Sequence, residues 1–158
     1  TLDRSSAASD VYKRQHWFFL IRPAPLPEAL IESNPELYLR SVMGSRSAGL
    51  KPFTDEAFAE YLRCLQLPGT ARGICEDYRA AAGIDLEHDQ ADIDAGNHLN
   101  LPLLVMWGAE GTVGRCFEPL KEWQKVATDV RGKALPAGHY IAEEAPELLL
   151  GEVLAFLR

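Results

Sequence analysis

Hydrophobic and polar positions in the last third of the chain follow a regular order. An apolar run covers 101–107 and stops at Gly108, and a second apolar run covers 130–135 and is followed by a proline. Short apolar runs bounded by Gly or Pro are typical of buried strands. Between the two runs, at about 116–128, apolar residues recur with helical spacing, and a further helical pattern closes the chain. We therefore expect strand, helix, strand and helix in this order.

The middle of the chain predicts helices, and no strand signal stands out between 22 and 98. Three prolines exclude a helix interior at 22–27, because proline lacks the amide hydrogen and fixes φ. Asn34 followed by Pro35 is a good helix start, since the Asn side chain can cap the helix and proline suits its first turn. Spacing and capping residues predict helices at about 27–32, 35–43, 54–65, 70–82 and 84–95.

The first fifteen residues do not share these patterns. Residues 1–15 are polar, show neither a helical nor a strand period, and precede a sharply apolar segment at 16–21. They look like translated adaptor sequence or an ordinary flexible tail, and we exclude them from the fold prediction. The expected organisation is a foreign or disordered tail at 1–15, a helical cap at 16–98 and a C-terminal α/β unit at 99–158.

Composition restricts the function more than the fold. The chain has 158 residues, of which 47% are hydrophobic, and a formal net charge of −7. A nucleic-acid-binding protein would need a basic stripe, which is absent, so we expect no nucleic-acid partner. No apolar run reaches the length of a membrane span, so we expect no membrane association and a cytoplasmic location. The three cysteines match no metal or disulfide framework, and no cofactor is predicted.

Gly138-His139 is the candidate catalytic feature. This step follows the second predicted strand and precedes the last helix, so His139 should lie at the carboxyl end of the sheet, where such folds bind ligands. An imidazole at that place can act as a general base. The alternative is a surface histidine in a strand-to-helix loop. A histidine base also needs a nucleophile, and the sequence shows none at a strand-to-helix elbow.

Other patterns favour structural explanations. The serines of 45–49 nearly match the spacing of a nucleophile elbow, but a helix precedes them. The acids of 85–89 alternate as in a calcium loop, yet the turn glycine is lacking, so we expect the solvated face of a helix. His88 and His98 have no ligand partners at metal spacing. Glu110, after the first predicted strand, is a weak candidate for an acid that orients the base.

His16, Trp17 and Tyr78 are the candidate binding residues of the cap. Taken singly, each of these residue types is more often part of a core or a surface than of a site. Together they place three hydrogen-bond donors in one helical lid, an imidazole N–H, an indole N–H and a phenol O–H.

Several segments together resemble the haloacetate (fluoroacetate) dehalogenases, a branch of the α/β-hydrolase superfamily. These segments are 16–19, 23–27, 74–79, 87–89 and 138–146. The most specific are His-Trp-Phe-Phe at 16–19 and Ile-Cys-Glu-Asp-Tyr-Arg at 74–79. The resemblance runs from His16 to Arg158. It implies an α/β fold that is the C-terminal part of an α/β-hydrolase, with a helical cap, the last βαβα unit and an incomplete sheet.

The resemblance also implies a reaction. In this family an Asp carboxylate displaces halide from a haloacetate, and water activated by a histidine hydrolyses the resulting ester to glycolate. His139 corresponds to that base, and His16, Trp17 and Tyr78 correspond to the halide-binding donors. A small haloacid is then the substrate, and the parent protein is expected to be a homodimer. The family's nucleophile, its substrate-binding arginines and its orienting Asp all precede the His-Trp pair, so we expect a C-terminal fragment that is inactive alone.

Two other functions remain open. An epoxide hydrolase also uses an Asp nucleophile and a histidine base, and Tyr78 would then protonate the epoxide oxygen. The His16-Trp17 pair favours halide, because an epoxide oxygen needs a proton more than it needs anion solvation. A non-catalytic helical interaction module would require the cap to fold alone and the Gly-His loop to be incidental.

Overall fold

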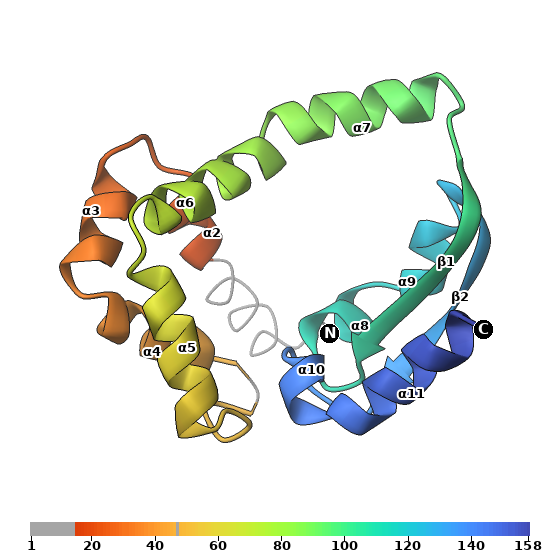
Figure 1. The fold of residues 1–158 in the computed structure, drawn as a ribbon. Coiled ribbons are helices and arrows are strands. Elements are labelled where there is room, and N and C mark those ends of the chain that lie inside the picture. The colour runs from red at the N-terminus through yellow and green to blue at the C-terminus, as the bar shows by residue number, and fades with distance from the viewer. Residues whose placement is uncertain (1–14, 47) are drawn as a thin grey trace, which may run out of the picture. The chain divides into compact units, whose positions relative to one another are not determined.

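The computed structural model describes residues 15–46 and 48–158, and its contacts divide the chain into two compact units. The helical unit comprises the described residues up to Val42 together with Asp55–Asp89, and the α/β unit comprises those of Met43–Thr54 and Gln90–Arg158. Figure 1 shows both units, coloured by residue number.

The helical unit contains the helices that the sequence predicts between 27 and 95, together with one at 15–20 that the sequence patterns do not predict. They are α2 (Gln15–Leu20), α3 (Leu26–Ser33), α4 (Pro35–Gly44), α5 (Asp55–Leu65), α6 (Thr70–Ala81) and α7 (Ile84–Asp94), of which α4 and α7 extend into the α/β unit. Asn34 caps α4 as expected, because its side-chain oxygen accepts a hydrogen bond of 3.1 Å from the amide of Leu37. The tail predicted at 1–15 lies outside the described residues, apart from Gln15 at the start of α2.

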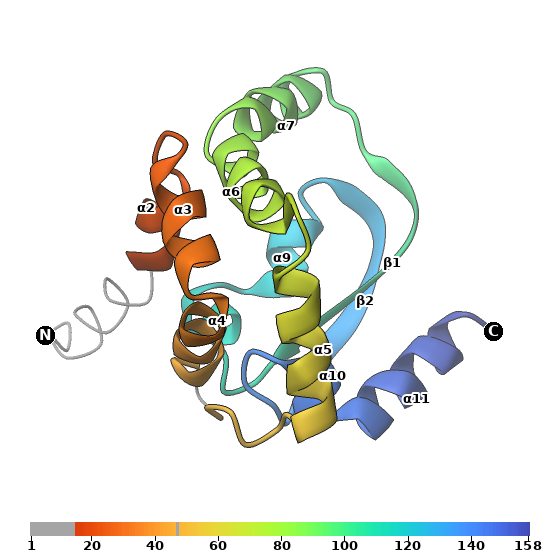
Figure 2. The same ribbon diagram turned by 60° about the vertical axis from the view of Figure 1, so that its left-hand side comes forward.

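The core of the helical unit lies where α2, α3, α5 and α6 meet. Its buried side chains are Leu20, Ile31, Leu65, Ala71 and Cys75. Ile74 and Tyr78, one turn apart on α6, share a face of this helix and pack against the core. Figure 2 shows α2 and α3 beside α6, and both helices contact it. The core therefore fixes the helix pair that carries the cap residues.

The α/β unit contains a two-stranded parallel sheet, which confirms both predicted strands. They are β1 (Leu99–Gly108) and β2 (Ala127–Leu135), connected by the short helices α8 (Thr112–Cys116) and α9 (Pro119–Trp123) and followed by α10 (Ile141–Glu144) and α11 (Pro146–Phe156). Gly108 pairs with Leu135, so the two strands end together at the edge where the Gly-His step follows. The closing helical pattern is divided, because Pro146 starts a new helix.

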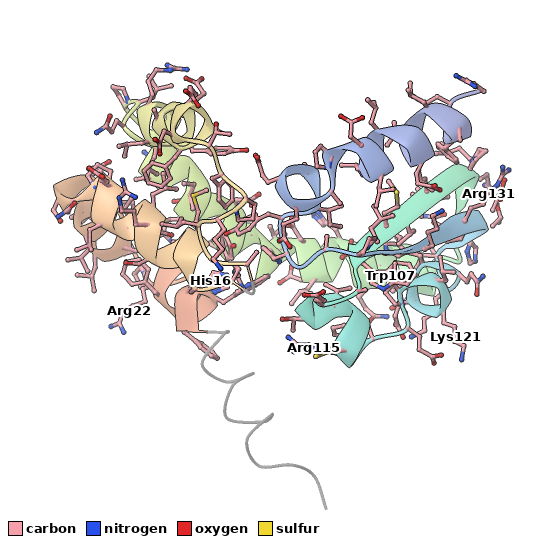
Figure 3. All side chains as sticks on the ribbon, turned by 90° about the horizontal axis from the view of Figure 1, so that it is seen from below. His16, Arg22, Trp107, Arg115, Lys121 and Arg131 are labelled. Carbon is pink, nitrogen blue, oxygen red and sulfur yellow. The ribbon has the colours of Figure 1, made fainter. Side chains whose placement is uncertain are left out.

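Helices lie on both faces of this sheet. Trp107 of β1 lines an open depression with residues of α8 and α9, whereas Leu104 lines another with Ala155 and Phe156 of α11. Side chains alternate between the two faces of a strand, so these two positions of β1 face opposite ways. Accordingly, α8 and α9 lie on one side of the sheet and α11 lies on the other (Figure 3).

The single helix predicted at 116–128 is wrong. α8 ends at Cys116, α9 begins at Pro119 and β2 begins at Ala127. Pro119 cannot lie inside a helix, because its ring fixes φ and it has no amide hydrogen to donate, but it suits a first turn. The residues from Ala127 onward pair with β1 instead. Strand pairing thus overrides the local helical spacing of this segment.

Two glycines allow the backbone to approach itself closely. A Cβ atom at Gly108 would lie 1.8 Å from the carbonyl oxygen of Gly138, and one at Gly132 would lie 1.7 Å from that of Val105. Gly132 also has a φ of +155°, which other residues rarely adopt. Non-bonded heavy atoms prefer separations of about 3.5–4 Å, so no side chain fits at either position. Gly108 therefore sets the distance between the end of β1 and the loop that follows β2.

We expect Gly108→Ala to lower the free energy of unfolding by about 3 kcal/mol or more, because the added methyl group overlaps backbone that cannot simply rotate away. Urea denaturation of the whole chain measures this change. Gly151→Ala is the matched control, since Gly151 lies within α11 and a Cβ there would meet nothing within 4 Å. The control should gain about 0.5–1 kcal/mol through better helix propensity. Equal effects of the two substitutions would contradict the close approach.

Candidate functional site

The structure brings together the three cap residues that the sequence singles out. His16 and Trp17 lie on α2 and Tyr78 lies on α6 (Figure 3 labels His16). The ring of Tyr78 meets both others edge-on, with centroid distances of 5.8 Å to His16 and 4.9 Å to Trp17. Trp17 is 43% exposed, so this cluster lies at the surface of the helical unit. A phenol, an indole and an imidazole therefore stand within one small area, while their roles as halide donors remain a prediction.

Arg79, which follows Tyr78 on α6, connects this helix through hydrogen bonds to the segment that follows α2. Arg79 donates from Nε and Nη2 to the carbonyl oxygen of Arg22, at 2.9 and 2.6 Å, and from Nη1 to Glu28 on α3 at 2.7 Å. Its side chain is 18% exposed and that of Glu28 is 10% exposed, so the ion pair is largely removed from water. Sequence patterns do not predict this ion pair, because a charged position beside a buried one can equally face solvent.

The hydrogen bond from Arg79 dominates the electrostatics of Glu28. It holds the pKa of that carboxyl below its ordinary value, against the opposing effect of burial. The second carboxylate oxygen of Glu28 is buried, and among the described residues it has no hydrogen-bond partner. The pair therefore depends on a single charge-assisted contact across α3 and α6.

His139 lies in the loop between β2 and α10, as the sequence predicts. Its side chain is exposed, and its ring meets that of Tyr140 edge-on at 5.0 Å. Tyr140 in turn meets the ring of Phe53, also at 5.0 Å, within the same unit. The position at the carboxyl end of the parallel strands is the expected one for a ligand-facing loop. The role of His139 as a base is not tested by this geometry.

The other described residues that the sequence patterns single out lie in helices, turns or loops. Residues 85–89 are exposed on α7, as predicted for the solvated face of a helix, and Ser45 lies in the turn after α4, whereas Ser47 is outside the described residues. Glu110 follows β1, and its side chain is exposed. No group of three or more His, Cys, Asp or Glu side chains is arranged to hold a metal ion within the described part of the chain.

An open depression of the α/β unit is lined by residues of β1, α8 and α9 and not by His139. It measures about 480 Å³ and is lined by Trp107, Gly114, Phe117, Glu118, Pro119, Leu120, Lys121 and Gln124. Figure 3 labels Trp107 and Lys121, on β1 and α9. None of the predicted site residues lines it. Among the helices described here, none has the length and apolar character that a membrane span requires.

The chain is similar in sequence and in structure to part of several known proteins. The chain is 33% identical over 133 residues to the fluoroacetate dehalogenase of a Burkholderia species, with 84% of the chain covered. It is 32% identical over 131 residues to the soluble epoxide hydrolase of Corynebacterium sp. (strain C12), with 81% covered. A solved structure of an α/β-hydrolase from Nostoc sp PCC 7120 is 44% identical in sequence, with 99% of the chain covered and a TM-score of 0.85. No family model matches the chain.

These matches extend over only part of each relative. The chain spans 43% of both curated relatives and 52% of the Nostoc chain. The likenesses therefore concern the fold of a segment and the residues within it. The activities named for the relatives belong to longer proteins.

We expect the ion pair of Glu28 to make stability depend on pH. The pKa of this carboxyl is lower in the folded chain than in the unfolded chain, so the pair stabilises the fold above about pH 4.5 and its contribution is lost as the pH falls through the folded-state pKa. Urea denaturation of Glu28→Gln should show a deficit in unfolding free energy at pH 7 that shrinks at pH 3.

Glu36→Gln is the matched control for this measurement. Glu36 pairs with Arg40 at 2.8 Å on α4, but about half of each side chain is exposed. Exposed pairs of this spacing contribute at most about 0.5 kcal/mol, so the control should change little at either pH. A deficit of Glu28→Gln that stays constant between pH 7 and pH 3 would contradict the coupling to Arg79.

Proposed function

We propose that this chain, which has the fold of part of an α/β-hydrolase, supplies the lid and the histidine base of an enzyme that hydrolyses haloacetates. The meeting of His16, Trp17 and Tyr78 carries this proposal, because three different N–H and O–H donors gather there from two helices. The likeness to a fluoroacetate dehalogenase supports the same substrate class.

The proposed reaction has two steps. An Asp carboxylate supplied by the remainder of the enzyme attacks the carbon that bears the halogen, and the carbon–halogen bond breaks as halide leaves with the bonding electrons. His139 then takes a proton from water, and the resulting hydroxide attacks the carbonyl of the ester. Breakdown of that intermediate releases glycolate, whose alkoxide oxygen takes the proton held by His139. The Asp carboxyl group returns to its carboxylate form by losing a proton to water. His139 acts as a general base only in the second step.

The three donors of the helical unit act in the first step. Fluoride is strongly hydrated, so its departure needs hydrogen bonds that replace those of water where negative charge develops. The imidazole of His16, the indole of Trp17 and the phenol of Tyr78 can each donate one such bond. Tyr78 packs against the core of the helical unit, so its hydroxyl group needs little reorganisation as the carbon–halogen bond breaks.

The described residues do not provide the nucleophile for this reaction. Their aspartates lie within helices or strands rather than at a strand-to-helix turn; they are Asp55, Asp77, Asp85, Asp89, Asp92, Asp94 and Asp129. A carboxylate on a helix or strand lacks the exposure and backbone geometry of a nucleophile elbow. The proposal therefore includes the absence of turnover by the 158-residue chain alone.

Epoxide hydrolysis is the second candidate function. The likeness to a soluble epoxide hydrolase has nearly the same identity and coverage as that to the dehalogenase. In that reaction the Asp nucleophile would attack an epoxide carbon and form an ester, while Tyr78 donates its proton to the epoxide oxygen as the ring opens. His139 would again activate water for hydrolysis of the ester. The two candidates share the base and differ in what the cap donors do.

A fused enzyme tests the proposed reaction. We expect no fluoride release from fluoroacetate by the chain alone, and release when the chain is joined to the part of the Burkholderia dehalogenase that the match leaves out. In that fusion, His139→Ala should lower glycolate formation on the order of 10²–10⁴-fold, because ester hydrolysis loses its base. Fluoride should still appear as a single stoichiometric burst, since displacement does not need the base.

The control for this substitution is His98→Ala, which removes an exposed histidine of the same unit. It should leave glycolate formation unchanged. Turnover by the chain alone, or steady fluoride release by the His139 variant, would contradict the proposal that an Asp outside the chain displaces the halide and His139 acts in ester hydrolysis.

Tyr78→Phe in the same fusion separates the two candidate functions. Loss of a donor to the departing halide costs on the order of 2–4 kcal/mol of barrier, so release of fluoride should slow by roughly 30- to 1000-fold. Release of chloride from chloroacetate should slow less, because chloride is less strongly hydrated. Tyr61→Phe, on α5, is the control and should leave both rates unchanged. Equal slowing for the two haloacetates rules out the halide role, and loss of epoxide opening alone would favour the second candidate.

A further inference from the structure

The carboxylate of Glu144 accepts hydrogen bonds from the backbone on both sides of His139. The amide of Gly138 donates to Oε2 of Glu144 at 2.6 Å, and the amide of Tyr140 donates to Oε1 at 3.0 Å. Each carboxylate oxygen thus accepts one bond, and the two donors are the residues immediately before and after the histidine. Bonds of this kind to an ionised acceptor are stronger than those between neutral groups.

The same loop is fixed from its other side by main-chain contacts. The amide of Glu110, after β1, donates to the carbonyl of Ala137 at 3.0 Å. The carbonyl oxygen of Gly138 occupies the space where Gly108 lacks a side chain. The loop therefore lies between the backbone after β1 and the carboxylate of Glu144.

This arrangement differs from an ordinary helix cap. Tyr140 is the N-cap of α10, and its own side chain does not cap the helical amides that follow. In a capping box the third helical residue reaches back to the N-cap amide only. Here the fourth residue, Glu144, reaches back to that amide and also to the amide of Gly138, which lies outside the helix. The second bond adds nothing to the helix and restrains only the loop.

We propose that Glu144 is a positioning residue for His139. Its carboxylate holds the two peptide units that flank the histidine, so that the Cα–Cβ bond of His139 keeps one direction. The ring of Tyr140, packed between those of His139 and Phe53, restrains the imidazole further. Because a displacement of about 1 Å can cost a reacting group 10²-fold in rate, such restraint matters for a base that must meet one water molecule.

Only the catalytic meaning of this inference rests on the proposed function; the restraint itself concerns the loop whatever His139 does. Nuclear magnetic resonance of the whole chain tests it without any assay of activity. In the unaltered chain, we expect scalar correlations through the hydrogen bonds from the amide nitrogens of Gly138 and Tyr140 to the side-chain carboxyl carbon of Glu144. We also expect contacts between the ring protons of His139 and Tyr140.

Glu144→Gln should break this arrangement, because an amide side chain offers one acceptor oxygen and turns an N–H group toward the other donor. Hydrogen exchange of the Gly138 and Tyr140 amides should quicken by about tenfold or more. The ring contacts of His139 should weaken, while amides of β1 and β2 keep their exchange rates. Glu147→Gln is the matched control, since Glu147 is an exposed acid in the first turn of α11, and it should change neither signal.

Three outcomes would overturn the inference. One is the absence of both scalar correlations in the unaltered chain, a measurement that needs no variant to fold. Another is unchanged exchange of the two amides in Glu144→Gln. The third is faster exchange with unaltered His139 ring contacts, which would reduce Glu144 to a structural cap. Failure of the fused enzyme to release fluoride would contradict the proposed function and would leave these signals untouched.

Discussion

The absence of a side chain at Gly108 is the constraint on which the arrangement of the α/β unit depends. The carbonyl of Gly138 fills the place of the missing methyl group, so the end of β1 and the loop after β2 meet backbone to backbone. Hydrogen bonds from Ala109 to Leu135 and from Glu110 to Ala137, of 2.8 and 3.0 Å, join the same two segments. Main-chain contacts do not depend on rotamers, so they place the loop that carries His139 with little freedom.

The helical unit uses main-chain acceptors in a similar way. Arg79 binds the carbonyl of Arg22 twice and also reaches Glu28, and so joins α6 to the segment between α2 and α3. Removing such an ion pair from water has a desolvation cost that can exceed its attraction. Besides its contribution to stability, the contact joins α6, which carries Tyr78, to the chain that follows α2, which carries His16.

Sequence patterns predicted most of the elements but not the contacts that fix them. Apolar runs and capping residues predicted β1, β2 and the helices of the helical unit other than α2, because these signals act within a few residues. The helix expected at 116–128 fails, since pairing of Ala127 with β1 is a long-range effect that no local period reports. The contacts of Arg79 and Glu144 could not be predicted, because the partner of a charged side chain is known only from the folded structure. The order of strands and helices suggested a role for His139, whereas the role of Tyr78 came from the resemblance to hydrolases.

One property of Glu144 bears on how this loop can vary in evolution. Its carboxylate accepts hydrogen bonds from the peptide nitrogens of Gly138 and Tyr140. Residue 140 can therefore change in identity and still donate its hydrogen bond to Glu144, provided that its backbone nitrogen carries a hydrogen. Proline alone is incompatible with that requirement. Related loops could thus look dissimilar in sequence and still share one geometry, recognisable only by an acid four positions after residue 140.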